Sequence, residues 1–135
     1  MGSGLREAFP TLDAEGLGVV DVGASGGIHH PVFEEVAPLL DVVGFEPDAE
    51  ESRRLNEAAR GAGRFRSLQA LPYALGQCEG EQVLHVGRLP GTSSFYRPNQ
   101  AFLSRFPDGA RYDVVGTVPV TVRALDRLAA DPSAA

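Results

Sequence analysis

The side chains best suited to chemistry in this chain are the carboxylates of Asp21 and Glu46, each at the end of an apolar run. Asp21 precedes a glycine-rich turn at residues 23–27, and Glu46 is followed by Pro47 and Asp48. In an open α/β sheet, such a turn lets the backbone approach a ligand closely. An acid at the end of the next strand accepts hydrogen bonds from ribose hydroxyls. The spacing therefore predicts a nucleoside-binding site.

The turn does not have the glycine pattern of a dinucleotide-binding loop. Counting from Gly23, Ser25 and Ile28 stand where G-x-G-x-x-G requires glycines. The carboxylate of Asp21 would repel a pyrophosphate but attract the ammonium of an amino acid. These features favour S-adenosylmethionine, which carries an ammonium and a sulfonium and no phosphate.

The elements that position these acids follow from apolar runs and helix signals. Asp48 is expected to cap a helix that runs to about Arg60 and ends at Gly61 or Gly63, with Glu51 placed as in a capping box. We expect its residues Leu55, Ala58 and Ala59 to face inward. The other elements predicted in the first half are a buried parallel strand at Leu17–Val22, a helix from Pro31 to about Ala37, and strands at Asp41–Phe45 and Phe65–Leu68.

The second half has a different pattern. Gly116 and Pro119 interrupt a β segment at 112–122, which predicts an edge or bulged strand. Asn99 is expected to cap a short helix. The remaining predictions are a half-exposed antiparallel strand at Glu81–Val86, a loop at Arg88–Pro98, residues Phe102, Leu103 and Phe106 on the short helix, and a terminal helix at Leu125–Ala130.

Five segments in this order resemble the N-terminal half of the FkbM family of methyltransferases, over roughly residues 17–126. They read V-V-D-V-G-A-S-G-G, G-F-E-P-D, L-P-Y-A-L-G, S-S-F-Y-R-P-N and V-P-V-T-V-R-A-L-D. The resemblance implies an α/β fold with a truncated, Rossmann-like class I methyltransferase sheet and an antiparallel β extension. It also implies O-methylation of a sugar or natural-product hydroxyl. Accordingly, residues 1–16 are a lead-in, 17–130 a partial, cofactor-binding methyltransferase domain, and 131–135 a tail.

The resemblance assigns residues to the S-adenosylmethionine site. It places the turn at the methionine part, Glu46 at the ribose, and Ala74 and Leu75 near the adenine. Ala124 replaces the family's usual threonine, and no catalytic base is assigned. The cofactor-binding set is Asp21, Gly23, Ala24, Ser25, Gly26, Glu46, Pro47, Asp48, Ala74 and Leu75, and the substrate-side candidates are His29, His30, Ser93 and Ser94.

Two other interpretations remain open. Family members continue with a strand that lies beside the one at 17–22, so we expect a truncated chain in which 17–22 is an exposed sheet edge. Such a chain could be a non-catalytic module that self-associates through that edge. More distantly, G-A-S-G-G fits the nucleophile elbow of α/β hydrolases, with Ser25 as nucleophile and His85 as the candidate histidine.

Composition excludes several other classes. A chain of 135 residues is one domain at most, and its net charge of −6 disfavours nucleic acid and anionic membranes as partners. All 12 basic residues are arginine, so no lysine forms a Schiff base. We predict no metal site. A zinc cluster cannot be built around the single cysteine, Cys78, and the side chains of the adjacent His29 and His30 point apart. No apolar run reaches the ~20 residues of a membrane span, and we expect a cytoplasmic protein that acts on a small-molecule hydroxyl.

Overall fold

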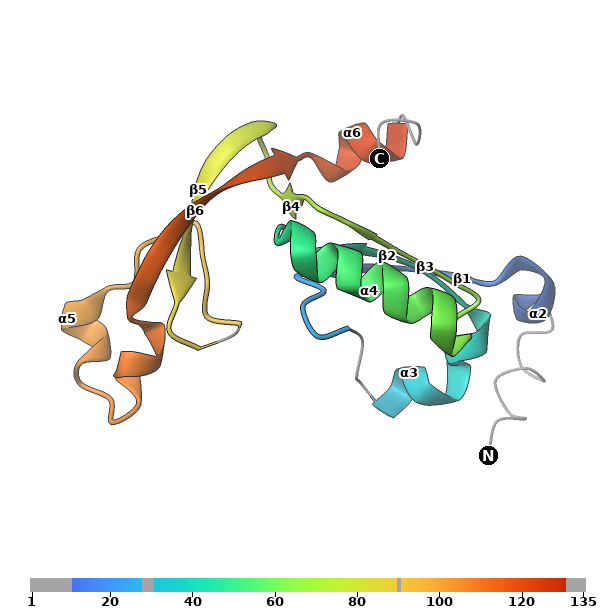
Figure 1. The fold of residues 1–135 in the computed structure, drawn as a ribbon, viewed down its shortest axis with the longest axis horizontal. Helices are drawn as coiled ribbons and strands as arrows, with labels where there is room; N and C mark the ends of the chain where they lie inside the picture. The colour runs from blue at the N-terminus through green and yellow to red at the C-terminus, as the bar shows by residue number, and fades with distance from the viewer. Residues whose placement is uncertain (1–10, 28–30, 90, 131–135) are drawn as a thin grey trace. The chain divides into compact units, whose positions relative to one another are not determined.

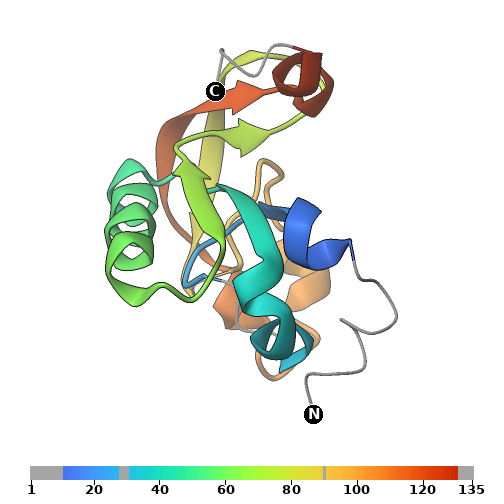
Figure 2. The same ribbon diagram turned by 90° about the vertical axis from the view of Figure 1, so that its right-hand side faces the viewer.

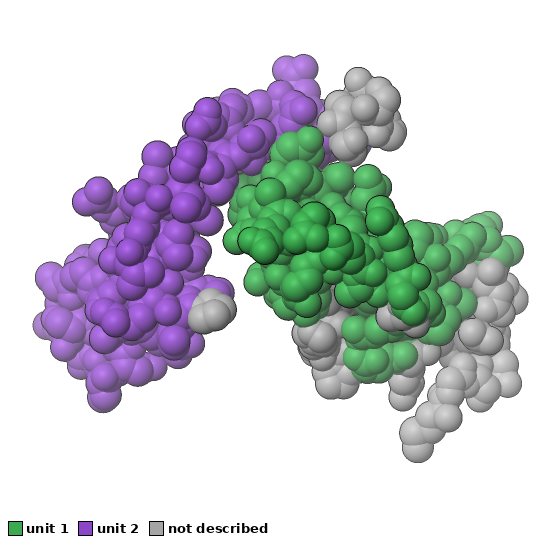
Figure 3. All heavy atoms as spheres, viewed as in Figure 1, with its two compact units in different colours: residues 1–74 green, residues 75–135 purple. Residues whose placement is uncertain are grey.

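The computed structural model describes residues 11–27, 31–89 and 91–130. The chain divides into two compact units, residues 1–74 and residues 75–135 (Figure 3). Unit 1 contains a parallel sheet and unit 2 a mixed sheet, so the α/β class is confirmed, and the arrangement is consistent with a Rossmann-like kind of fold. Among the described residues, no helix is both long enough and apolar enough to cross a membrane.

Unit 1 is built on a three-stranded parallel sheet in the order β1-β2-β3 (Figure 1). Its strands are β1 (Leu17–Val22), β2 (Leu40–Phe45) and β3 (Ser67–Leu71), and its helical segments are α2 (Leu12–Glu15), α3 (Pro31–Val36), the 3₁₀ helix η1 (Ala37–Leu39) and α4 (Ala49–Ala62). The strand at 17–22 has the predicted bounds. The third strand begins two residues later than predicted and continues to Leu71.

Strand β1 is an edge of this sheet, as expected, but it is not the buried strand that its apolar sequence predicted. Leu17, Val20 and Val22 are 45%, 51% and 63% exposed. Val19 instead packs towards buried Leu40 and Val42, on the face that also receives side chains of α3. Alternation along the strand puts Val20 and Val22 on the opposite face, where both are exposed.

Helix α4 runs along one face of the parallel sheet (Figures 1 and 2). The Asp48 carboxylate caps it by accepting the N–H groups of Glu50 and Glu51 at 2.9 and 3.1 Å. Of the two predicted stops, Gly63 is confirmed, because it caps the helix with a left-handed φ of 55°, whereas Gly61 lies inside the helix.

The inward face of α4 is narrower than predicted. Leu55 is buried against Ala24 of the glycine turn and Ala70 of β3. Ala59 is half-buried, but Ala58 is exposed, so its expected inward position is wrong. The contact between Leu55 and Ala24 ties the packing of α4 to the position of the turn.

Unit 2 is built on a sheet in the order β4-β6-β5, in which β5 and β6 are antiparallel. Its elements are β5 (Gly80–Gly87), α5 (Gln100–Leu103), the 3₁₀ helix η2 (Gly109–Tyr112), β6 (Val114–Arg123) and α6 (Leu125–Ala130), together with β4 (Ala74–Leu75), which begins at the last residue of unit 1. The Asn99 side chain caps α5 by accepting the Phe102 N–H at 3.1 Å, as predicted. Phe106 lies beyond the end of α5, and its ring is 5.3 Å from that of Phe102.

Strand β6 contains Pro119 without losing its pairing to β5. In β5, the backbone N–H and C=O of His85 both bond to Ser94, so they point away from β6. His85 faces Thr117 in the register, and the two residues therefore form a non-hydrogen-bonded pair. The N–H and C=O of Thr117 accordingly point away from β5. By alternation, the missing N–H of Pro119 also falls on the side away from β5. The predicted bulge is confirmed opposite Val86, whereas the edge prediction is only half right, because β4 lies beside β6 near Arg123.

Candidate functional site

The glycine turn and Glu46 are held together by the backbone at the carboxyl ends of β1 and β2. The N–H groups of Gly23 and Ala24 both donate to the carbonyl of Phe45, at 2.9 and 3.1 Å. Glu46 is the next residue, and its own N–H donates to the carbonyl of Leu71 at 3.0 Å. The structure therefore brings the two sequence motifs side by side, at the edge where open α/β sheets bind ligands.

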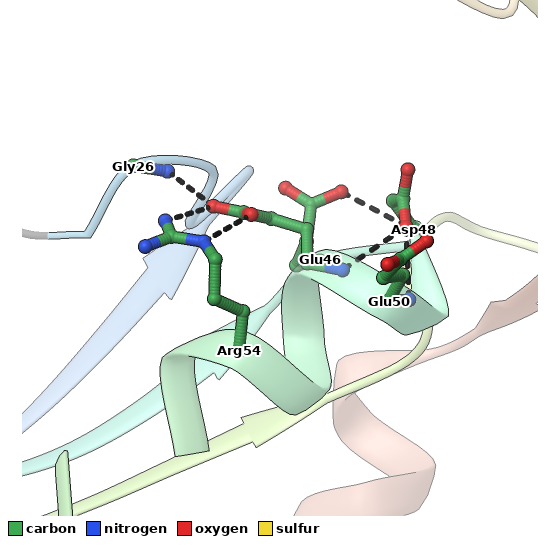
Figure 4. Close-up of polar contacts among 6 residues, drawn as sticks. Gly26, Glu46, Asp48, Glu50 and Arg54 are labelled. Carbon is green, nitrogen blue, oxygen red and sulfur yellow. Dashed lines mark hydrogen bonds and ion pairs between the residues drawn. The ribbon is translucent and has the colours of Figure 1, made fainter. Parts of the chain in front are cut away.

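The Glu46 side chain is buried, with 7% of its surface exposed. Its Oε1 accepts the backbone N–H of Asp48 at 3.0 Å, which fixes the carboxylate between β2 and α4 (Figure 4). Among the described residues, no hydrogen bond is donated to Oε2, so this oxygen is the candidate acceptor for a ligand hydroxyl.

The glycine turn has a backbone that only glycine adopts easily. Gly23, Gly26 and Gly27 have φ values of 78°, 80° and 81°. The turn is closed by the Gly27 N–H, which donates to the carbonyl of Ala24 at 2.8 Å. A Cβ atom placed on Gly23 or Gly26 would meet no atom within 4 Å. Within the described part of the chain, the outer side of the turn is therefore open space.

The other turn residues differ in where their side chains lie. Ala24 is buried in the packing between α4 and the sheet, so only its backbone faces the turn. Ser25 is exposed. Asp21 is half-buried and lies opposite Gly44 in the β1–β2 register. A Cβ atom on Gly44 would lie 3.0 Å from Cβ of Ala24, so Ala24 occupies the space beside Gly44.

Sequence reasoning missed that Glu51, which is paired with Arg54, also bonds to the glycine turn. Glu51 Oε1 accepts the Gly26 N–H at 2.9 Å, and Arg54 Nε and Nη2 donate to the same carboxylate at 2.7 and 2.6 Å (Figure 4). The Arg54 hydrogen bonds, with help from the Gly26 N–H, lower the pKa of Glu51 to about 2. The same pair raises the pKa of Arg54. An ion pair thus anchors the turn to α4.

The expected capping box is not formed, and this is why Glu51 is free to reach the turn. In a capping box the third residue of the helix would accept the Asp48 N–H. Here Glu46 takes that N–H instead. The spacing of Glu51 and Arg54, three residues apart, was the signal in the sequence for their ion pair. Nothing in the spacing indicated that the Glu51 carboxylate would also bond to Gly26.

The charge around the turn is predominantly negative. Arg53 is committed to Glu57, at 2.6 Å, and lies 4.0 Å from Glu50. Arg54 is committed to Glu51. The acids of this region are Asp21, Glu46, Asp48, Glu50 and Glu51. This arrangement favours a cationic ligand over an anionic one.

The remaining predicted residues lie elsewhere. Leu75, Ser93 and Ser94 belong to unit 2. Ser93 Oγ accepts the Gly87 N–H at 3.2 Å, and Ser94 Oγ accepts the Tyr96 N–H at 3.1 Å, so both hydroxyls already stabilise their own loop. Pro47 is half-buried after Glu46, and Ala74 is buried at the end of unit 1. His29 and His30 lie outside the described residues, and His85, the histidine of the hydrolase interpretation, is in β5 of unit 2.

A cavity of about 580 Å³ lies along α4 rather than at Glu46. Leu55, Phe65 and Leu68 form part of its wall, and Gly26 lies at its border. The cavity follows the contact between α4 and β3, so it does not coincide with the acids at the strand ends. Among the described residues, no group of three or more His, Cys, Asp or Glu side chains is arranged to hold a metal ion.

Comparison with known proteins finds no matching family model, no matching curated protein and no matching solved structure.

Proposed function

We propose that this chain is the cofactor-binding part of an FkbM-like, S-adenosylmethionine-dependent O-methyltransferase. The observation that carries the proposal is the position of Glu46. Its buried carboxylate is fixed by the Asp48 N–H and directly follows Phe45, whose carbonyl holds the glycine turn. A fixed acceptor beside an open turn suits the two hydroxyls of a ribose.

The charge of the site supports a phosphate-free ligand. In a dinucleotide-binding loop, backbone N–H groups of the turn point at a pyrophosphate. Here the Gly26 N–H is occupied by the Glu51 carboxylate, which would repel that group. The ammonium and sulfonium of S-adenosylmethionine are attracted by the same acids, and Asp21 is the candidate partner of the ammonium.

The chain's own residues account for binding rather than for the transfer step. Methyl transfer to a hydroxyl requires in-line approach of the oxygen and a base that takes its proton. We assign the ribose to Glu46 and the methionine end to the turn at 23–26. The acceptor is proposed to be a sugar or natural-product hydroxyl, and the cell compartment the cytoplasm.

Calorimetric titration with S-adenosylhomocysteine tests the proposal. We expect the chain to bind this ligand and to bind NAD much more weakly. Glu46→Gln should lower the affinity by roughly tenfold or more, because the charged acceptor of a ribose hydrogen bond is lost. Glu50→Gln is the matched control, since the Glu50 side chain is 87% exposed. Absence of binding to the folded wild-type chain, or equal effects of the two substitutions, would contradict the proposal.

A further inference from the structure

The Glu51 carboxylate receives hydrogen bonds from donors of the kind that bind phosphate. Its Oε1 accepts the Gly26 N–H at 2.9 Å and Arg54 Nη2 at 2.6 Å, and its Oε2 accepts Arg54 Nε at 2.7 Å. A backbone N–H of a turn and a forked guanidinium are common donors to phosphate oxygens. In this chain the two donors lie side by side, and a side chain of the chain itself occupies them (Figure 4).

This carboxylate is held in place and stays charged. The Glu51 side chain is 22% exposed, whereas that of the preceding residue, Glu50, is 87% exposed. The hydrogen bonds from Arg54 and from the Gly26 N–H lower the pKa of Glu51 to about 2, so the carboxylate is ionised at neutral pH. A phosphate that approached these donors would therefore have to displace a fixed negative charge.

The other acids near the turn are engaged differently. Among the described acids, Glu51 is the one whose side chain accepts an N–H of the turn. Glu46 Oε1 accepts the Asp48 N–H at the end of β2, where dinucleotide-binding proteins also carry an acid for the ribose. Glu46 is thus compatible with ligands that contain phosphate and with ligands that do not. Asp21 lies within β1, two residues before Gly23.

We propose that Glu51 determines the class of ligand that the turn accepts, a role that rests on the proposed function of the turn as a cofactor loop. Its carboxylate occupies the position of a phosphate and so excludes nucleotides that carry a pyrophosphate. Without this carboxylate, the Gly26 N–H and the Arg54 guanidinium become donors to an oxyanion, and the local charge rises by one unit. Asp21 has the separate role of attracting the ammonium of the ligand.

Calorimetric titration with inorganic pyrophosphate and with ADP tests this role. ADP shares its adenosine with S-adenosylhomocysteine and adds a pyrophosphate. We expect Glu51→Ala to bind both probes at least about tenfold more tightly than the wild-type chain, because a repelling charge is removed and two donors are released. Adding Arg54→Gln should cancel most of this gain, because the released guanidinium is then absent.

A second variant separates the charge of Glu51 from its anchoring of the turn. Glu51→Gln removes the charge but keeps an oxygen that can accept the Gly26 N–H. Its affinity for pyrophosphate should lie between those of the wild-type chain and Glu51→Ala. Circular dichroism identifies the variants that are folded. A folded Glu51→Gln or Glu51→Ala chain with no more affinity for pyrophosphate than the wild type would overturn the proposal.

Two controls exclude a general effect of net charge. Glu50→Gln removes one negative charge from the same helical turn at an exposed side chain, so we expect a gain in pyrophosphate affinity of less than roughly threefold. Asp21→Asn should weaken binding of S-adenosylhomocysteine and raise the affinity for ADP less than Glu51→Ala does. If either control gains as much affinity for the phosphate probes as Glu51→Ala, the assignment to Glu51 is wrong.

Failure of this role can be told apart from failure of the cofactor proposal. A wild-type chain that does not bind S-adenosylhomocysteine contradicts the cofactor proposal, while a gain of pyrophosphate affinity in Glu51→Ala would still support the exclusion of phosphate by Glu51. In the opposite case, the wild-type chain binds S-adenosylhomocysteine but Glu51→Ala still rejects ADP and pyrophosphate. That result would leave the cofactor proposal standing and overturn the role of Glu51.

Discussion

The backbone N–H of Gly26 donates to the carboxylate of Glu51 at 2.9 Å, and this bond fastens the glycine turn to the first turn of α4. Arg54 holds the same carboxylate from one helical turn further on. The turn is therefore positioned by a side chain from the helix after the next strand. A change at Glu51 should be felt at the candidate site as well as in the stability of unit 1.

Glu51→Gln should lower the free energy of unfolding by about 1 kcal/mol at neutral pH, because a charge-assisted hydrogen bond and a surface ion pair are weakened. Urea unfolding followed by circular dichroism measures the change. Glu50→Gln, in the same helical turn, is the control. Its side chain is 87% exposed and lies 4.0 Å from Arg53, so we expect no measurable effect.

The same substitution has a defined pH dependence. The pKa of Glu51 is lowered from 4.5 to about 2 by Arg54 and by the Gly26 N–H. A carboxylate whose pKa is lower in the folded state stabilises that state fully above its unfolded pKa. The difference between wild type and Glu51→Gln should therefore shrink as the pH falls from 4.5 towards 2. A difference that stays constant over this range would argue against the assigned pair.

Gly44 and Gly18 provide a matched pair of substitutions in adjacent strands. A Cβ atom on Gly44 would lie 3.0 Å from Cβ of Ala24, whereas one on Gly18 would meet nothing within 4 Å. We expect Gly44→Ala to destabilise unit 1 by about 1 kcal/mol and to shift the glycine turn. Gly18→Ala should change stability by less than about 0.5 kcal/mol. Thermal unfolding of both variants decides the point, and a larger effect at Gly18 would contradict the packing described.

The two glycines near the end of α4 should respond in opposite directions to alanine. Gly61 lies inside the helix, so Gly61→Ala should stabilise it by about 0.5 kcal/mol. Gly63 has a left-handed backbone, with φ 55°, so Gly63→Ala should cost about 1 kcal/mol. Denaturant titration of the two variants locates the helix end. Stabilisation by both substitutions would place it beyond Gly63.

The sequence was sufficient to predict elements whose signals are local. Leu17–Val22 and Leu125–Ala130 have the predicted bounds, and Asp48 and Asn99 cap the predicted helices. Local chemistry at the end of an element determines each of these.

Predictions failed where contacts between distant residues decide the outcome. Glu51 has the spacing of a capping box, but Glu46 takes the Asp48 N–H and Glu51 bonds across to Gly26. This choice is not encoded within one helix. The link between turn and helix therefore became visible only in the structure.

Asn56 should prove necessary for the stability of unit 1. Asn56→Ala leaves the N–H of Ala70 without its side-chain partner, and Ser52 alone remains on the carbonyl. We expect a loss of about 1–3 kcal/mol in the free energy of unfolding, the usual cost of an unsatisfied buried group. Urea unfolding followed by circular dichroism measures the loss. An unchanged free energy of unfolding would show that Asn56 does not contribute to holding β3.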